Sequence, residues 1–297
     1  MNITPGTGAT RFQVRSLHPA LGAEFRGVDF NGPVDEEAAA AIHAAWMEHL
    51  VLVFPDQPVT DDWHVEVTRC FGEAEVFHQD ILKSTTVREI FRVSNTDETG
   101  TIMPREHPTM QQLSSARTWH TDSSYRPVPA MGSLLHGIEV SRTGGQTCFS
   151  NMYAVWEALP EAWKDRIRGR RARHDFEMLS RITGARKPTE AERAAMPPVW
   201  QPMVRRHPVT GRTSLYISPI YNDRIEGMED EDAVEFIGEL AEFASQERFV
   251  YCHRWETDDI VMWDNRCTMH RVTPHDPGER RVMHRTTIVG DGPVLAA

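Results

Sequence analysis

The stretch Phe249-Val-Tyr-Cys-His-Arg-Trp255 opens the part of the chain that decides the fold. It is rich in aromatic and β-branched residues, and two similar runs follow it, Asp259-Ile-Val-Met-Trp263 and the residues from Arg280 to Val289. Residues of these types favour the pleated, partly buried surface of a β-strand. We therefore expect the C-terminal part of the protein to consist of strands that polar loops connect.

Helical patterns are fewer and flank the strand patterns. Capping residues and good helix formers predict helices over residues 35–50, 60–72, 156–173 and 230–249. Strands are expected at 12–30, at 50–54 and in short runs between 92 and 140, and a hairpin is expected over 204–217. This order predicts an α+β fold around an antiparallel core, and a double-sheet jelly roll fits it.

Length and composition leave the organisation simple. The chain has 297 residues, of which 40% are hydrophobic and 25% are charged, and both values are ordinary for a globular protein. Because no internal repeat divides the sequence, we expect one domain over residues 1–297. The polar segment around residues 175–200, which contains Pro197-Pro198, is expected to be a lid inserted into that domain.

Charge and cysteine content restrict the partners and the compartment. The formal net charge is −11, which argues against nucleic acid or an anionic membrane surface as the main partner. No run approaches the roughly 20 apolar residues of a spanning helix, and the N-terminus lacks the apolar core of a secretory signal. The four cysteines are far apart in sequence, so we expect reduced thiols in a cytoplasmic enzyme.

The sharpest chemical signal is Trp119-His-Thr-Asp-Ser-Ser124. Residues i and i+2 of an extended segment point to the same side, so His120 and Asp122 can present a nitrogen and an oxygen to one metal ion. A third ligand must come from elsewhere, and His270 is the candidate. Two histidines and one carboxylate on one side of an octahedron are typical of Fe(II) oxygenases. A zinc hydrolase uses the same ligand types, so that alternative stays open here.

A site for a 2-oxo acid would separate these two interpretations. Arg281 and Arg285 follow His270 at an even mutual spacing, so on a strand both face the same side. A guanidinium pairs with a carboxylate through two parallel hydrogen bonds, and Thr147, after the turn at Gly144-Gly145, can add a hydroxyl. The spacing favours an iron oxygenase. An inert site or another metal stays open, because a His-x-Asp tripeptide alone is common.

Four segments resemble the taurine and phenoxyacetate dioxygenase family of 2-oxoglutarate-dependent oxygenases. They are Trp119-His-Thr-Asp-Ser-Ser124, Gly144-Gly-Gln-Thr147, Trp263-Asp-Asn-Arg-Cys-Thr-Met-His270 and Arg280-Arg-Val-Met-His-Arg285. The resemblance extends from about Phe12 to about Asp291. It implies a double-stranded β-helix with flanking helices and a homodimer or homotetramer. It also implies Fe(II) chemistry, in which 2-oxoglutarate and O₂ give succinate and CO₂ while the substrate is hydroxylated.

The resemblance assigns roles to individual residues. The implied iron ligands are His120, Asp122 and His270. Thr147 and Arg281 match the positions that hold the distal carboxylate of 2-oxoglutarate, and Trp263 matches a residue that lines its pocket. Arg285 matches the arginine that reaches the anionic group of the substrate.

The substrate is expected to belong to the phenoxyacetate branch. The segments Arg92-Val-Ser-Asn-Thr-Asp-Glu-Thr-Gly100 and Ala195-Met-Pro-Pro198 resemble that branch more than the taurine branch. Two positions also depart from the taurine pattern, because Ala116 replaces an expected asparagine and His78 is one residue out of place. We expect an aryloxyalkanoate-like or other carboxylate substrate, with a sulfonate or alkyl sulfate as the alternative.

Three further residues are candidates for contact with the substrate, namely His78, Lys83 and Tyr125. The alternative for His78 and Lys83 is that they are surface loop residues, and Tyr125 can equally be a core aromatic residue. The remote alternative to the whole interpretation is a non-oxidative jelly-roll protein that binds a small acid, or a zinc hydrolase on the same scaffold.

Four polar residues near these motifs carry structural expectations. Ser123 and Ser124 are candidates to donate hydrogen bonds that orient Asp122. His275 lies in a polar loop and is expected in solvent, and His284 is expected to face away from the arginines on either side of it.

Overall fold

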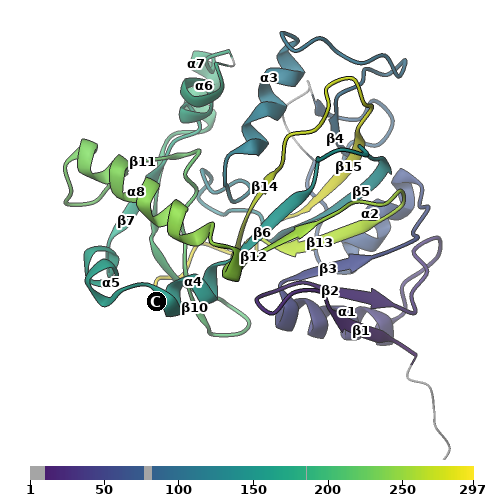
Figure 1. The fold of residues 1–297 in the computed structure, drawn as a ribbon, viewed down its shortest axis with the longest axis horizontal. Helices are drawn as coiled ribbons and strands as arrows, with labels where there is room; N and C mark the ends of the chain where they lie inside the picture. Colours follow the sequence, from purple (N-terminus) through teal and green to yellow (C-terminus); the bar gives the residue numbers. More distant parts are fainter. Residues whose placement is uncertain (1–10, 77–81, 185) are drawn as a thin grey trace, which may run out of the picture.

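A seven-stranded sheet forms the largest layer of the protein (Figure 1). The computed structural model describes residues 11–76, 82–184 and 186–297. The strand order is β1 (Gln13–Ser16), β2 (Ala23–Arg26), β3 (Val51–Phe54), β13 (Ile260–Asp264), β5 (Gly132–Glu139), β15 (Val282–Ile288) and β4 (Phe91–Ser94). Neighbours are antiparallel except for β2 and β3. The sheet therefore places N-terminal strands beside C-terminal ones.

A second, three-stranded antiparallel sheet packs against the first. Its order is β12 (Val250–His253), β6 (Thr147–Asn151) and β14 (Thr268–Val272). Phe149 from β6 lies in one buried cluster with Leu135 of β5 and Trp263 of β13. The two sheets therefore share a core, and the segments that carry the predicted metal ligands border the space between them.

Two helices cover the opposite face of the large sheet, α1 (Glu36–His49) and α2 (Asp61–Arg69) (Figure 1). Side chains of adjacent strand residues point to opposite faces, so Leu134 packs on the helix side while Leu135 packs on the side of the second sheet. Asp35 accepts a hydrogen bond from the backbone N–H of Ala38 at 2.8 Å and so caps α1. Such a cap stabilises a helix by about 1 kcal/mol.

A third group of elements lies at the left of Figure 1. It contains α4 (Met152–Ala158), α5 (Glu161–Ile167) and α8 (Asp230–Ala244). It also contains the sheet of β11 (Asn222–Ile225), β7 (Arg171–His174) and β8 (Val199–Pro202), and the hairpin of β9 (Val204–Arg206) and β10 (Thr213–Leu215). Phe236 and Leu240 of α8 are buried against these strands.

Short helices near the top of Figure 1 complete the structure. They are α3 (Pro108–Ser114), α6 (Met178–Thr183) and α7 (Glu190–Ala195). A 3₁₀ turn, η2 (Ser115–Arg117), follows α3, and another, η3 (Glu247–Phe249), connects α8 to β12. The α3 and α6 helices contact one another. The segment expected as a lid therefore contains helices, and α7 begins with a capping box between Thr189 and Glu192.

The structure confirms the α+β class and most of the predicted elements, and two regions differ. The single helix predicted over 156–173 is wrong, because α4 ends at Ala158 and α5 begins after Pro160. The second helix ends at Ile167, because Gly169 adopts a φ of 68° and the chain then enters β7. The α3 helix interrupts the region between 92 and 140 that was expected to hold only strands. Pro108 stands in its first turn, where the missing N–H costs nothing, and His107 caps it.

The expectation of four reduced thiols is wrong for one pair. Cys148 and Cys252 form a disulfide, while Cys70 and Cys267 are free. The two bonded cysteines are 104 residues apart in sequence, yet they are directly opposite each other in the pairing of β6 with β12. Only the strand register brings them together, which is why their spacing gave no signal.

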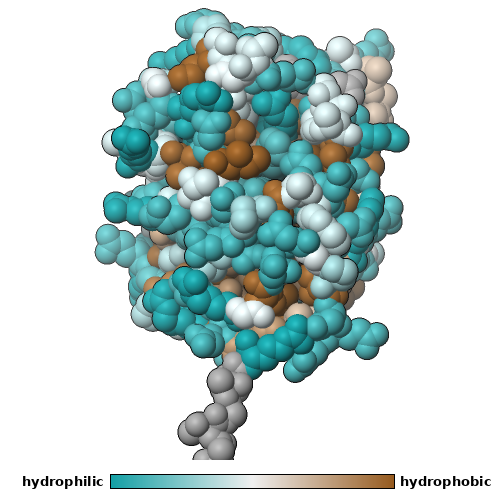
Figure 2. Space-filling model, turned by 90° about the vertical axis from the view of Figure 1, so that its right-hand side faces the viewer, coloured by the Kyte–Doolittle hydropathy of each residue, from teal (hydrophilic) through white to brown (hydrophobic). Residues whose placement is uncertain are grey.

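The outer surface carries scattered apolar groups. On the face shown in Figure 2, hydrophobic residues form small areas separated by hydrophilic ones. Val14 and Val128 are among the larger apolar side chains that are exposed. Within the part of the chain that the structure describes, no helix is both long and apolar enough to cross a membrane.

Candidate active site

The structure brings His120, Asp122 and His270 together between the two sheets. One ligand atom from each lies within 4.8 Å of the others, and all three residues are buried. His120 pairs with His270 of β14 through two backbone hydrogen bonds of 3.0 and 2.8 Å. The pairing places both imidazoles on one side, so a gap of 150 residues in the sequence closes to a single site.

The orientation of each side chain leaves lone pairs for a metal ion. The Nδ1 of His120 lies 2.8 Å from the carbonyl oxygen of Thr118, which can only accept, so Nδ1 carries the hydrogen and Nε2 is bare. The Nε2 atoms of His120 and His270 lie 3.9 and 3.8 Å from the carboxylate oxygens of Asp122. Burial lowers the pKa of both histidines, which favours the neutral form that binds metals.

Asp122 is held ionised by its surroundings. Burial alone would raise the pKa of its carboxyl group, but the Arg285 guanidinium and the two imidazoles outweigh that effect and keep the pKa well below its usual value. Arg285 Nη1 lies 3.0 Å from Asp122 Oδ1, and Ser133 Oγ donates to Oδ2 at 3.3 Å. The serine that donates a hydrogen bond to Asp122 is therefore Ser133 of β5. The expectation that Ser123 or Ser124 orients Asp122 is wrong.

Ser124 has another partner, since its hydroxyl lies 3.0 Å from Nδ1 of the buried His174. Ser123 adopts a φ of 55°, so the chain turns directly after Asp122. Ser133 reaches the carboxylate only through the folding of β5, and no sequence signal marks it.

Arg281 is a buried cation without a carboxylate partner. Its side chain donates to the carbonyl oxygen of Gly145 at 3.3 Å, and among residues 11–76, 82–184 and 186–297 no carboxylate lies within ion-pair distance. Burial lowers its pKa to about 10. A desolvated guanidinium with free N–H groups is well suited to an anionic ligand, and Arg281 lines the same cavity as the three metal-ligand candidates.

Thr147 and Trp263 also line this cavity. The Thr147 hydroxyl accepts a hydrogen bond from the indole Nε1 of Trp255 at 3.1 Å. The Trp263 ring lies 4.9 Å from the ring of His270, measured between centroids. A Cβ atom at Gly144 would lie 1.9 Å from the carbonyl oxygen of Pro274, so the turn before Thr147 requires glycine.

The cavity has a volume of about 460 Å³, which is within the range of small-molecule sites. One wall is aromatic, because Tyr125 lies 4.8 Å from Phe176 and 4.9 Å from Tyr221 between ring centroids. Leu179 of α6 extends this wall, and α3 with η2 forms part of the other side. Polar side chains at the rim include Arg105, Gln111, Gln112 and Arg117.

Arg285 reaches the cavity from β15. Its guanidinium lies 4.6 Å from the centroid of the Phe91 ring and pairs with Asp122 through Nη1. The Nε atom is buried and has no hydrogen-bond partner in the described residues. Arg285 therefore serves the metal-ligand candidate Asp122 directly, and part of its guanidinium still faces the cavity.

Several sequence expectations for other residues have different outcomes. Lys83 pairs with Phe91 in a β-bridge and is not among the residues that line the cavity, and His78 lies outside the described residues. His275 was expected in solvent, but it is half-buried and lines the cavity because its backbone pairs with Gly144. His284 does face away, since its Nδ1 lies 2.6 Å from Asp61 in α2.

The sequence motifs missed several lining residues, among them Arg105, Arg117, Phe176 and Tyr221. They come from loops and short elements whose position depends on packing. Phe176 and Tyr221 were unmarked aromatic residues, and the only available signal was their type.

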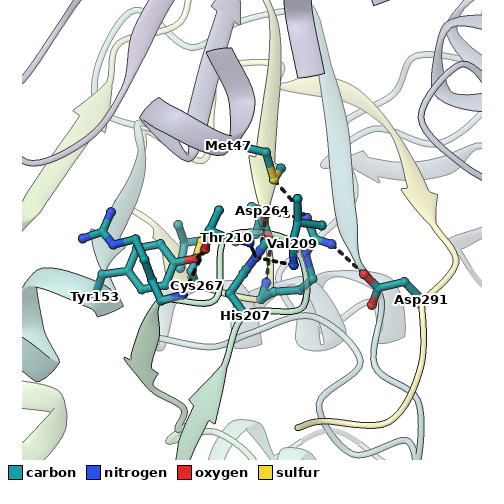
Figure 3. A network of polar contacts seen from close by, with 11 residues as sticks. Met47, Tyr153, His207, Val209, Thr210, Asp264, Cys267 and Asp291 are labelled. Atoms are coloured by element: carbon teal, nitrogen blue, oxygen red, sulfur yellow. Dashed lines mark hydrogen bonds and ion pairs between the residues drawn. The ribbon is translucent and has the colours of Figure 1, made fainter. Parts of the chain in front are cut away.

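A second buried group also contains residues that bind metals, His207, Asp264 and Cys267 (Figure 3). Asp264 Oδ2 accepts from His207 Nε2 at 3.0 Å and from Arg266 Nη2 at 2.7 Å. Asp264 Oδ1 accepts from the backbone and Nε of Arg266 at 2.8 and 2.9 Å. His207 Nδ1 accepts from two backbone N–H groups. Burial raises the pKa of the Cys267 thiol well above its usual value.

This network is therefore closed and structural. Arg266 also pairs with Asp291 at 2.6 Å, so the network ties the turn between β13 and β14 to the hairpin and to the C-terminal region (Figure 3). The conspicuous Trp263-Asp-Asn-Arg266 run thus anchors the start of the strand that carries His270.

The ligand set, the buried unpaired arginine and the cavity together point to a known enzyme family. The model of the taurine catabolism dioxygenase TauD, TfdA family matches residues 13–287. The chain belongs to this family. It is an oxidoreductase that depends on Fe(II), 2-oxoglutarate and O₂ and acts on a small molecule.

Individual relatives agree with this membership. The chain is 33% identical over 282 residues to the alpha-ketoglutarate-dependent 2,4-dichlorophenoxyacetate dioxygenase of Cupriavidus pinatubonensis, covering 94% of this chain and 98% of the relative. It is 32% identical to the (S)-phenoxypropionate/alpha-ketoglutarate-dioxygenase of Delftia acidovorans, covering 95% and 96%.

Solved structures give the same result. The structure of AAD-2 in complex with Mn(II) and N-oxalylglycine matches with a TM-score of 0.88 and 33% identity, and the match covers 96% of this chain and 99% of that one. The expected family and reaction class are confirmed, and the non-oxidative and zinc-hydrolase alternatives are set aside.

Proposed function

We propose that this dioxygenase hydroxylates an aryloxyalkanoate-like or other carboxylate substrate in the 460 Å³ cavity. The observation that carries the proposal is the position of the buried, unpaired Arg281 in the same cavity as His120, Asp122 and His270. A 2-oxo acid chelated at the three candidate ligands needs a partner for its distal carboxylate, and a buried guanidinium in the same cavity supplies one.

We assign the iron to His120, Asp122 and His270. Their free lone pairs, burial and mutual distances fit an ion with two nitrogen ligands and one oxygen ligand. When bound, the iron supplies the activation of O₂ that couples decarboxylation of 2-oxoglutarate to oxidation of the substrate. The Thr118 carbonyl, Ser133 and Arg285 orient these ligands.

We assign the co-substrate to the side of the cavity that Arg281 and Thr147 border. The guanidinium and the hydroxyl would donate to the distal carboxylate, and Trp263 would pack against the carbon chain. Burial makes each of these hydrogen bonds stronger than it would be in water, because little solvent competes.

We assign the substrate to the aromatic side of the cavity. Tyr125, Phe176 and Tyr221 form a wall that suits an aryl group, and the Arg285 side chain, which lines the cavity, suits an anionic group near the metal. The two relatives named above act on phenoxyalkanoates, which supports the same class. A sulfonate or alkyl sulfate is the second candidate, since a guanidinium binds those anions as well.

A substrate panel tests this proposal. Purified protein with Fe(II) and 2-oxoglutarate is assayed for substrate-dependent succinate release with phenoxyacetates, phenoxypropionates, sulfonates and alkyl sulfates. We expect coupling with the aryloxyalkanoates. Coupling with the sulfur acids alone would overturn the proposed substrate class. Phe176→Ala should raise KM for aryl substrates and leave the KM for 2-oxoglutarate unchanged.

We further propose that the two sheets form a double-stranded β-helix within one domain, and that the segment around residues 175–200 acts as a lid. Phe176, Leu179 and Thr183 from this segment line the cavity, which supports the second part. Limited proteolysis tests it, because substrate and 2-oxoglutarate should protect this segment. Equal cleavage with and without ligands would contradict a lid.

A homodimer or homotetramer in the cytoplasm is also proposed. Light scattering tests the assembly, and a monomeric mass would overturn it. Cell fractionation tests the compartment. Recovery of the protein outside the cytoplasm, where a disulfide such as Cys148–Cys252 is common, would overturn the cytoplasmic assignment.

A further inference from the structure

The hydroxyl of Thr147 has a defined neighbour that the site described so far does not use. Thr147 begins β6, where it pairs with His253 of β12 on one side and Val272 of β14 on the other. Its side chain is buried, and the hydroxyl accepts a hydrogen bond from the indole of Trp255 at 3.1 Å. No other hydrogen bond to this hydroxyl exists within the residues that the structure describes.

Packing holds the Trp255 ring in one place. Trp255 is 6% exposed and meets the ring of His253 edge-on, with 4.7 Å between centroids. His253 is itself fixed, because its two ring nitrogens lie 3.0 Å from Tyr251 Oη and 3.0 Å from Asp259 Oδ2. Gly137 leaves room for the indole, since a Cβ atom there would lie 3.0 Å from Cε3.

The direction of this hydrogen bond decides what Thr147 can offer. An indole N–H only donates, so the threonine oxygen must be the acceptor. A hydroxyl has one hydrogen, and that hydrogen then has to point away from Trp255. Thr147 lines the cavity together with Arg281, so its hydrogen is available to a carboxylate placed against both residues.

We propose that Trp255 is a positioning residue for 2-oxoglutarate, because its indole fixes the Thr147 hydroxyl as a donor to the distal carboxylate. This inference rests on the proposed placement of 2-oxoglutarate at Arg281 and Thr147. It assigns to Trp255 a specific effect on the carboxylate, beyond filling space between β12 and β13. Without the indole N–H, the hydroxyl can rotate and use its hydrogen elsewhere.

The test is a binding measurement on the Mn(II)-loaded protein, in which no turnover occurs. Trp255→Phe keeps an aromatic ring and deletes the N–H. Calorimetry should show that this variant binds 2-oxoglutarate about three- to tenfold more weakly, the usual effect of losing one hydrogen bond. Binding of 2-oxopentanoate, which has the same chain length without the distal carboxylate, should not change.

Two controls separate this effect from a general loss of structure. Trp46→Phe is the matched substitution, because Trp46 of α1 is 1% exposed and its indole has no hydrogen-bond partner in the described residues. Trp46→Phe should leave the affinities for 2-oxoglutarate and 2-oxopentanoate unchanged. In a Thr147→Val background, Trp255→Phe should weaken 2-oxoglutarate no further.

A second variant keeps the proposal testable if Trp255→Phe does not fold. Gly137→Ala displaces the indole without removing any polar group, and it should weaken 2-oxoglutarate but not 2-oxopentanoate. Equal weakening of both acids, or unchanged binding of 2-oxoglutarate, would overturn the role of Trp255. If Arg281→Ala also leaves 2-oxoglutarate binding unchanged, the proposed co-substrate site is wrong as well. If only Arg281→Ala weakens it, the site stands and the role of Trp255 falls.

Discussion

Two buried groups in this protein contain residues of the types that bind metals. They differ in whether the lone pairs of these residues already accept hydrogen bonds from the protein. In the group of His120, Asp122 and His270, both Nε2 atoms are free of protein donors and a cavity lies beside them. In the group of His207, Asp264 and Cys267, both histidine nitrogens and both carboxylate oxygens already have partners. Residue type and proximity therefore do not identify a metal site. Unused lone pairs beside an accessible space make the group of His120, Asp122 and His270 the candidate metal site.

The largest expected effect comes from removing a ligand of the open group. His120→Ala should abolish detectable turnover and stoichiometric binding of Fe(II) or Mn(II), because two remaining ligands do not hold a catalytic metal. Metal analysis of the purified variant measures the binding, and succinate release measures the turnover. His43→Ala, in α1, is the control and should keep both. Full metal binding by His120→Ala would remove this histidine from the ligand set.

Removing the centre of the closed group should affect stability instead. Asp264→Ala removes the buried carboxylate that pairs with Arg266 and His207 and leaves Arg266 only its pair with Asp291. Breaking a buried pair costs about 3–5 kcal/mol of unfolding free energy. Denaturant unfolding measures the change. Variants that remain folded should bind one metal with unaltered affinity. Loss of metal from well-folded Asp264→Ala would show that the two groups are not separate in function.

Acid should remove the same contribution from the unmodified protein. Arg266 and His207 outweigh burial and hold the pKa of the Asp264 carboxyl group well below its usual range. The carboxylate therefore contributes its full stability above about pH 4, and that contribution is lost as the pH falls further. The difference in unfolding free energy between wild type and Asp264→Ala should accordingly shrink below pH 4. A constant difference down to pH 2 would contradict this.

Arg281→Ala should produce an intermediate effect that is specific to the open group. Losing a hydrogen-bonded pair with a charged ligand costs about 1.5–3 kcal/mol, so the Kd for 2-oxoglutarate should rise about ten- to a hundredfold. Metal affinity without 2-oxoglutarate should not change. Arg280→Ala is the matched control, because Arg280 is exposed and pairs with Glu139 at the surface. An equal effect in both variants would remove the special role of Arg281.

The smallest effect is expected for Cys267→Ala in the closed group. The thiol is buried and protonated, so its removal should lower the unfolding free energy by about 1 kcal/mol, as typical substitutions do. Metal stoichiometry, measured on the same sample, should be identical to wild type. If Cys267→Ala binds one metal ion fewer than wild type, the group of His207, Asp264 and Cys267 binds a metal and is not purely structural.

Local patterns predicted much of this molecule. Runs of apolar, aromatic and β-branched residues marked β13 and β15, capping residues marked α1 and α2, and the hairpin of β9 and β10 followed from its turn. These features depend on contacts between residues close in sequence, so a single sequence reveals them. The end of the helix before Gly169 was not predicted, because the sequence pattern does not show whether a helix continues through a single glycine or gives way to a strand there.

The candidate site was partly predictable for the same reason. The His-x-Asp motif, His270 and the two arginines have recognisable spacings, and resemblance to a family adds their roles. Ser133, Trp255, Phe176 and His275 have no such spacing. Ser133 and Trp255 contact residues of the site, and Phe176 and His275 line the cavity, through strand pairing and loop packing that involve residues distant in the chain.

The sequence by itself determined the class of the protein, its reaction chemistry and the residue types that the chemistry needs. Only the tertiary structure decided which of two similar groups has unused lone pairs, and that Cys148 faces Cys252. The physical reason is that a lone pair accepts a hydrogen bond from, and a thiol forms a disulfide with, whichever suitable group lies beside it in the folded chain. That neighbour is set by the register of strands and the packing of loops, which act across the whole chain.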